Sequence, residues 1–144
     1  MNLVLPSETI FHIIESTIKE YRKFAQKNIS EKIKDMTIDQ GLVLLFLNEY
    51  PDLTQKEIAE LVFKDNASMT RMINTMVQKK YLKRSMNNED RRRYKIEITS
   101  KGKDVLETLP PIIHHNRNSS LTGITKNELK QLETILNKIR ANCA

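Results

Sequence analysis

The chain has 144 residues, a length that suits one ordinary domain with a buried core. Of these residues 39% are hydrophobic and 29% are charged, and the formal net charge is +6. Its longest apolar run, residues 42–47, is too short to cross a bilayer, and its one cysteine, Cys143, excludes an intrachain disulfide and a cysteine-based metal cluster. The first residues lack the charged and apolar regions of a signal peptide, so the sequence predicts a cytoplasmic protein with no membrane partner.

Helix starts are marked by capping signals. Thr37, Thr54 and Thr125 are each followed three positions later by Gln or Glu, and such a capping box satisfies free N–H groups at a helix start. Asp65 and Thr99 are predicted to be N-caps without the full box. In chain order the sequence predicts helices over residues 7–33, 38–49, 55–62 and 66–79, a β-hairpin, a helix from about residue 99, and a last helix over 126–141.

The apolar spacing changes from helical to alternating after residue 80. Leu82, Arg84 and Met86 alternate with polar residues, as do Tyr94, Ile96 and Ile98. This period of two predicts a two-stranded hairpin with one buried face. Pro110 and Pro111 are predicted to bend the following helix, and Gly123 to interrupt the chain before the last one.

Positive charge is concentrated around this hairpin. Between Lys79 and Lys103 there are ten basic and three acidic residues, a local net charge of +7, so the rest of the chain sums to −1. A basic hairpin behind a short helix suits a polyanion that fits into a groove.

Two short helices followed by a basic hairpin are the parts of a winged helix-turn-helix, whose second helix enters the major groove of DNA. On the predicted helix over residues 66–79, Met69, Met72, Ile73 and Met76 form the packing face. The polar residues on the remaining faces, predicted to contact bases or phosphates in the major groove, are Ser68, Thr70, Arg71, Asn74, Thr75 and Gln78. The competing interpretation is an amphipathic core helix with a solvated polar face.

Residues 53–102 resemble the MarR family of bacterial transcription regulators. The resemblance is carried by LTQKEIA over residues 53–59, ASMTRMI over 67–73, YLKR over 81–84, and Asp90-Arg-Arg92 followed by IEITSKG over 96–102. Residues 121–128 also resemble the turn into the family's last helix. One departure is Lys80, where the family often has glycine; lysine in a left-handed conformation costs about 1 kcal/mol.

The resemblance implies roles for the wing. Arg92 matches the arginine that enters the minor groove, where a narrow A·T groove concentrates negative potential. Asp90 matches the acid that orients the wing by pairing with Arg84. Arg91 and Arg93 belong to the same wing segment, for which a solubilising charged loop is the alternative, and Lys83, Arg84 and Lys95 are predicted phosphate contacts.

The predicted fold class is mainly α, with a winged helix-turn-helix lobe (residues 37–104), a small β-hairpin wing, and N- and C-terminal dimerisation helices (1–36 and 105–144) in one MarR-like domain. The resemblance implies a homodimer that binds double-stranded DNA at a near-palindromic operator, most often as a repressor, without a cofactor. A winged-helix module that binds protein and not DNA is the alternative from another class. The sequence shows no nucleophile–base pair, phosphate loop or paired carboxylates, so no enzyme is predicted.

An effector site is a further expectation. Relatives bind small aromatic or anionic effectors in a crevice, whose walls here would be Tyr21, Phe24, Leu42, Phe46, Ile112 and His115. The alternative is that these side chains simply fill the core. A metal- or redox-responsive regulator would instead use His12, His114, His115 or Cys143, although adjacent histidines on a helix rarely share one ion, and no metal site is predicted.

Overall fold

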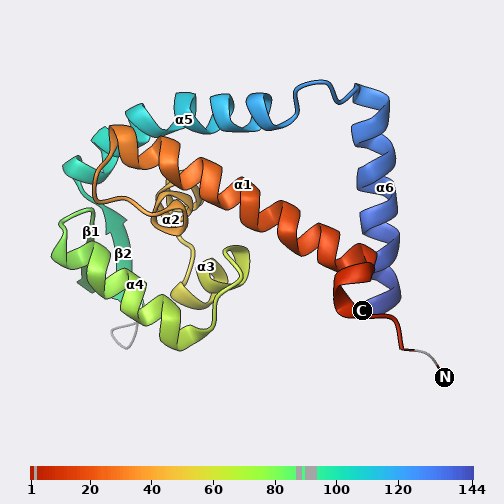
Figure 1. Cartoon of the computed structure of the whole chain (residues 1–144). Helices are drawn as coiled ribbons and strands as arrows, with labels where there is room; N and C mark the ends of the chain where they lie inside the picture. The colour runs from red at the N-terminus through yellow and green to blue at the C-terminus, as the bar shows by residue number, and fades with distance from the viewer. Residues whose placement is uncertain (2, 87–88, 90–93) are drawn as a thin grey trace.

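The computed structural model describes residues 1, 3–86, 89 and 94–144, which form a mainly helical chain with one β-hairpin (Figure 1). In chain order the elements are η1 (Pro6–Glu8, a 3-10 turn), α1 (Ile10–Lys32), α2 (Ile38–Glu49), α3 (Gln55–Leu61), α4 (Asn66–Gln78), β1 (Leu82–Met86), β2 (Tyr94–Ile98), α5 (Ser100–Ser120) and α6 (Lys126–Cys143). The predicted mainly α winged-helix class is confirmed. α1 begins at Ile10 and not at Ser7, because Thr9 is extended and separates it from η1.

The predicted helix caps are all present. Thr37, Thr54 and Thr125 each accept a hydrogen bond from the backbone N–H three residues later, and the Gln or Glu at that position accepts one in return. Asp65 and Thr99 cap α4 and α5 through single bonds from Ser68 and Gly102. Such a cap is worth about 1 kcal/mol, so the sequence marks helix starts strongly.

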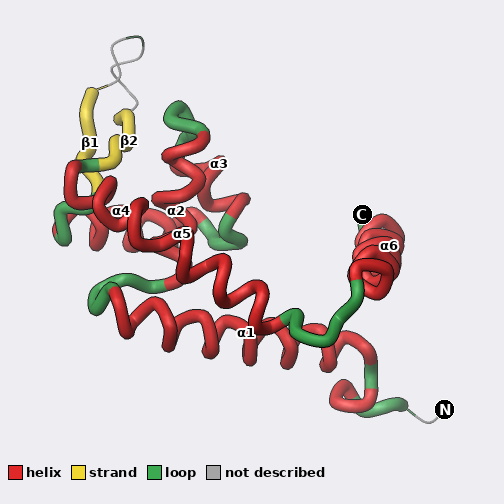
Figure 2. Tube along the Cα trace, turned by 90° about the horizontal axis from the view of Figure 1, so that it is seen from above, coloured by secondary structure: helices red, strands yellow, loops and turns green. Residues whose placement is uncertain are grey.

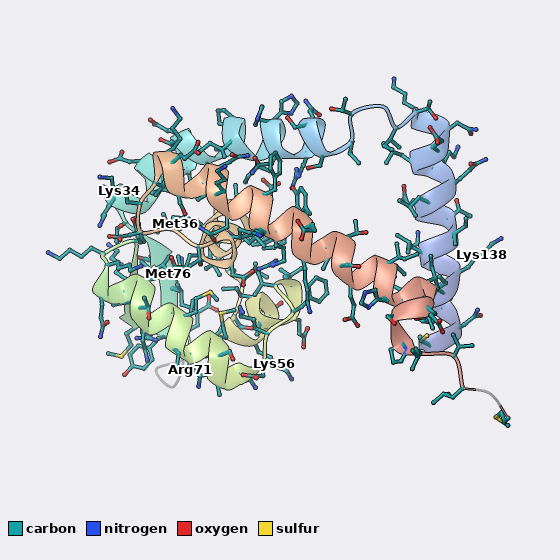
Figure 3. All side chains as sticks on the ribbon, in the orientation of Figure 1. Lys34, Met36, Lys56, Arg71, Met76 and Lys138 are labelled. Carbon is teal, nitrogen blue, oxygen red and sulfur yellow. The ribbon has the colours of Figure 1, made fainter. Side chains whose placement is uncertain are left out.

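The core is formed by residues of α1, α2, α3, α4, α5 and the base of the hairpin. α2 contributes more buried residues than any other described element, as its all-round apolar sequence predicts. On α4, Met69, Ile73 and Met76 are fully buried and Met72 is half-buried, which confirms the predicted packing face. Figure 3 places Met36 and Met76 inside the lobe, with Arg71 and Lys56 at its outer edge.

The hairpin is buried only at its base. β1 and β2 pair antiparallel with Leu82 opposite Ile98, Arg84 opposite Ile96 and Met86 opposite Tyr94. Leu82 and Ile96 are buried, whereas Met86 and Tyr94 are 60% and 70% exposed. The prediction of one buried face is therefore wrong for the outer half of the hairpin, because that half projects away from α1 and α5 (Figure 2).

Two helices end in left-handed residues that are not glycine. Lys80 has φ 68°, and the N–H groups of Lys80 and Tyr81 return to the carbonyls of Val77 and Met76. This is the Schellman motif, which usually has glycine at the left-handed position. Phe63, at the end of α3, has φ 59° in the same arrangement. Lys80 thus adopts the left-handed conformation that is costly for lysine, and a second such turn, at Phe63, was not predicted.

Lys80→Gly is expected to stabilise the fold by about 1 kcal/mol, because glycine adopts the left-handed conformation without the steric cost of a side chain. Lys80→Ala is the matched control, since it removes the same side chain but keeps the strained Cβ. Chemical denaturation of both variants measures the difference. Equal unfolding free energies for glycine and alanine at this position would contradict the account of the turn.

Large apolar side chains remain exposed at the two ends of the chain. Ile10, Ile13 and Ile18 of α1 are each more than half exposed, as are Leu132 and Ile135 of α6. α6, all of whose residues are described, has no buried side chain, and both views place it apart from the winged-helix lobe (Figures 1 and 2).

α5 runs as one helix through Pro110 and Pro111 and packs along α1. In the described part of the chain, no helix has the length and hydropathy needed to cross a membrane.

Candidate nucleic-acid interface

The start of α4 is fixed by Asp65. Its carboxylate accepts a hydrogen bond of 2.7 Å from the backbone N–H of Ser68. That bond, with the Ser68 side chain and the Arg71 charge, lowers the pKa of the Asp65 carboxyl below its ordinary value. The negative charge also lies favourably at the positive end of the helix.

This cap predicts a pH dependence. A carboxyl whose pKa is lower in the folded chain stabilises the fold above its unfolded pKa, and the contribution is lost as the pH falls through the folded pKa. Asp65→Asn keeps a capping oxygen but does not titrate. Below the ordinary aspartate pKa, wild type is therefore expected to lose unfolding free energy more steeply than Asp65→Asn. Denaturation at a series of pH values measures how the unfolding free energy of each protein depends on pH. Asp104→Asn is the control for the loss of one carboxylate. Parallel curves of unfolding free energy against pH for wild type and Asp65→Asn would contradict this role of the cap.

The polar residues predicted to read the major groove lie on the outer side of α4. Thr70, Arg71, Asn74 and Gln78 are exposed, and Ser68 and Thr75 are half-buried beside the packing face. One helix thus presents hydroxyls, carboxamides and a guanidinium to solvent along a single surface. These are the groups that hydrogen-bond base edges and phosphates.

Neighbouring elements hold several of these side chains in place. Gln55 of α3 donates a 2.8 Å hydrogen bond from Nε2 to the hydroxyl of Thr70. Within α4, Arg71 donates to the hydroxyl of Ser68 at 3.2 Å. From β1, Arg84 donates to Oδ1 of Asn74. The outer face of α4 is therefore a connected polar surface that reaches α3 on one side and the hairpin on the other.

Gln55 and Arg84 contact the outer face of α4 from other elements, so the helical spacing of α4 alone does not predict them. Arg84 was predicted to contact phosphate, and Gln55 was not predicted to belong to the site. Both pairings join residues ten or more positions apart in the chain, so only the packing of α4 against its neighbours brings them together. The available signal was weak: Gln55 follows the capping threonine of α3, a position that faces the start of the next helix.

The basic residues of the hairpin differ in their surroundings. Lys83 lies 3.5 Å from a carboxylate oxygen of Glu97 on the facing strand, with its side chain 62% exposed. Lys95 is exposed on β2. The predicted wing residues Asp90, Arg91, Arg92 and Arg93 lie outside the described residues.

A groove of about 1160 Å³ separates the hairpin from the segment before α3. One wall is residues 51–56, and the other includes Arg84, Glu89 and Tyr94. The groove carries carboxylates and basic groups on both walls, so it has no single charge preference.

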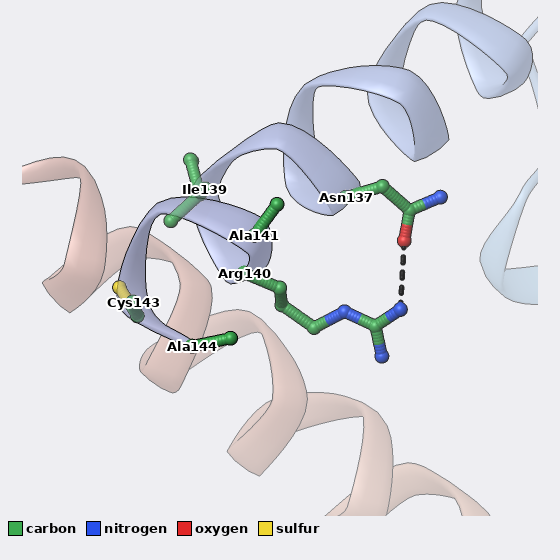
Figure 4. Close-up of a pocket in the computed structure, with 6 residues that line it drawn as sticks. All are labelled: Asn137, Ile139, Arg140, Ala141, Cys143 and Ala144. Carbon is green, nitrogen blue, oxygen red and sulfur yellow. Dashed lines mark hydrogen bonds between the residues drawn. The ribbon is translucent and has the colours of Figure 1, made fainter.

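The residues predicted to line an effector crevice differ in their surroundings. Leu42, Phe46 and Ile112 pack against the core, which favours the interpretation that they fill it. Tyr21 is half-buried, while Phe24 and His115 are exposed. A shallow hollow of about 620 Å³ lies at the end of α6, where Arg140 donates a 2.9 Å hydrogen bond to Asn137 (Figure 4).

The histidines and the cysteine that a metal- or redox-responsive regulator would use do not form a metal-binding cluster within the described residues. His114 and His115 hydrogen-bond within α5, to Asn118 and Ser119. Within the described ranges no group of three or more His, Cys, Asp or Glu side chains is placed to hold a metal ion. Cys143 is a free, exposed thiol near the chain end.

A half-buried carboxylate connects the turn before α4 to α1. Asp39, at the start of α2, lies 2.7 Å from the guanidinium of Arg22 on α1 and 3.1 Å from the ammonium of Lys64. Lys64 belongs to the turn that leads into α4. Asp39 therefore fixes the orientation of that turn relative to α1, a role that its sequence position in a helix start did not reveal.

Comparison with known proteins agrees with this geometry. The MarR family model matches residues 36–94. The chain is 33% identical over 90 residues to YwaE, an HTH-type transcriptional regulator of Bacillus subtilis (strain 168), covering 62% of this chain but only 53%, about half, of the length of YwaE. Two solved structures superpose with a TM-score of 0.84 at 20% identity: the MepR–DNA complex of S. aureus (97% of this chain, 100% of that one) and Bordetella bronchiseptica BpsR (96% and 98%), whose DNA binding is regulated by 6-hydroxynicotinic acid. Residues 36–94 thus match the MarR family, and the shared fold and the polar outer face of α4 make this chain similar to winged helix-turn-helix regulators of that family.

Proposed function

We propose that this protein is a sequence-specific DNA-binding transcriptional regulator that works as a homodimer on a near-palindromic operator. The observation that carries the proposal is the exposed polar face of α4 beside a basic hairpin. A helix of this kind fits the major groove, and the basic hairpin supplies the electrostatic attraction to phosphate.

The proposed contacts divide by groove. Arg71 and Gln78 present hydrogen-bonding groups to the major groove, with Ser68, Thr70 and Thr75 toward the adjoining phosphates. Lys83, Arg84 and Lys95 of the hairpin lie toward the DNA, with the two lysines on its phosphates. Arg92 enters the minor groove, with Asp90, Arg91 and Arg93 around it. Phosphate contacts position the protein and base contacts supply the specificity.

The proposed dimer uses the exposed apolar residues of α1 and α6. Residues 1–36 and 105–144 form the dimerisation part and 37–104 the DNA-binding lobe. A twofold dimer presents two copies of α4 to one face of the duplex, which is why the operator is expected to be near-palindromic. As a repressor, the dimer is released by a small aromatic or anionic effector that binds the non-operator spacing of the two α4 helices better.

Selection of bound duplexes from a random pool by the full-length protein tests the function. Enrichment of one sequence family is expected, with an affinity that falls as salt rises because bound protein releases counterions. A pool that stays random after repeated rounds at low salt would contradict the proposal and favour a winged-helix module that binds protein. Repeating the selection with salicylate-like compounds, zinc or peroxide tests the effector. If only zinc or peroxide releases the protein from DNA, the proposed organic effector is wrong.

A further inference from the structure

The hydrogen bond between Arg84 and Asn74 has a defined direction. Arg84 lies on β1 and Asn74 on the outer face of α4, and both side chains are exposed. A guanidinium only donates hydrogen bonds, so its partner on Asn74 must be the carbonyl oxygen Oδ1. The assignment of oxygen and nitrogen in this carboxamide therefore follows from chemistry. The two N–H groups of Nδ2 are left as the hydrogen-bonding edge of Asn74.

This direction conflicts with the usual role of asparagine in the major groove. Asparagine recognises adenine with two bonds: Oδ1 accepts from the N6 amino group while Nδ2 donates to N7. Here a cationic donor already lies on Oδ1. The second lone pair of Oδ1 remains, but an adenine amino group that donates to it would bring its hydrogens beside the guanidinium. Two positively polarised donors would then compete for one oxygen.

Guanine meets no such conflict. Its major-groove edge presents two acceptors, N7 and O6. Nδ2 of Asn74 and the guanidinium of Arg84 offer only donors. A donor-only pair matches an acceptor-only edge, and the local positive charge strengthens each bond, since charge-assisted hydrogen bonds are about twice as strong as neutral ones.

We propose that Arg84 is a specificity-determining residue that, by binding Oδ1 of Asn74, makes this pair select guanine over adenine at one position of each half-site. The proposal rests on the proposed DNA-binding function. It gives Arg84 a role that its position on the hairpin, beside the phosphate-contacting lysines, does not suggest. It also reverses the base that asparagine alone on a reading helix would be expected to prefer.

Selections with wild type and four variants test the proposal. Asn74→Ala identifies the base pair, because the preference changes at the position that Asn74 contacts. At that position wild type is expected to favour guanine over adenine about tenfold, the scale of one good two-bond base contact. Arg84→Met, which keeps an unbranched but shorter side chain without the hydrogen-bond donors, is expected to shift the preference to adenine. The double variant Asn74→Ala, Arg84→Met is expected to prefer neither, since the shift to adenine acts through Asn74.

Lys95→Met is the matched control, because it removes another exposed positive charge from the hairpin. It is expected to weaken all sequences similarly and to keep the guanine preference. Direct competition between two duplexes that differ only at this base pair measures the ratio even for variants that bind weakly. Thermal unfolding confirms that each variant is folded, which is expected because both side chains are exposed.

Different results would overturn the DNA-binding function and the specificity role of Arg84. If wild type enriches no duplex, the DNA-binding function is wrong. If wild type enriches an operator but prefers adenine at the Asn74 position, or if Asn74→Ala changes no position, the specificity role is overturned while the function stands. A guanine preference that survives Arg84→Met would likewise overturn it.

Discussion

Replacing Leu132 and Ile135 by aspartate is expected to convert the protein from a dimer to a monomer. Both side chains are more than half exposed on α6 in the single chain, and the proposed dimer covers them. Each large apolar side chain contributes about 1.5–3 kcal/mol when buried, and a twofold interface contains each residue twice. Placing charge there also adds a desolvation cost. Sedimentation over a concentration series measures the change.

The control for this double variant is Lys130→Asp. It changes the charge of each chain by the same amount, but at helical spacing Lys130 lies on the opposite side of α6 from the apolar stripe. It is expected to remain a dimer. A Leu132→Asp, Ile135→Asp protein that still sediments as a dimer would show that the interface involves other helices.

Arg71→Ala is expected to weaken binding to the selected operator by about 1–3 kcal/mol, the value of one well-placed base contact. Arg71 is exposed at the outer edge of the lobe (Figure 3) and donates to Ser68, so its remaining N–H groups are positioned by the helix itself. Base preference at one position is expected to relax, while the thermal midpoint changes little. Fluorescence anisotropy with the operator and with a scrambled duplex separates the specific loss from the general one.

Arg117→Ala is the matched control, because it removes an exposed guanidinium from the last turn of α5, and that end of α5 lies away from α4 (Figure 1). It is expected to bind the operator like wild type. Equal operator affinities for Arg71→Ala and wild type would remove Arg71 from the reading face.

The sequence predicted the helices well because their signals are local. The capping boxes at Thr37, Thr54 and Thr125 depend on residues within one turn, and the α4 packing face follows from helical spacing alone. The left-handed Lys80 was visible as a missing glycine, since the motif around it was recognisable. Phe63 gave no such signal, because phenylalanine is rarely left-handed and nothing in the surrounding motif marked the position.

The sequence could not predict interactions that depend on how elements pack. The alternation in the hairpin correctly predicted two strands, yet it could not indicate that only the base, at Leu82 and Ile96, is buried. Likewise, the spacing that placed Asn74 on the reading face said nothing about Arg84, which reaches it from another element. Alternation and helical period report which side of an element a residue occupies, and tertiary packing decides what lies there.

The architecture of the protein–operator complex shows whether two chains bind one near-palindromic duplex. Sedimentation of the protein with its selected duplex, together with the footprint on each strand, measures the number of chains and the spacing of the half-sites. The account predicts two chains per duplex on an inverted repeat whose half-site centres lie about 10–10.5 base pairs apart, one turn of the double helix. One chain bound to a single asymmetric half-site would contradict it.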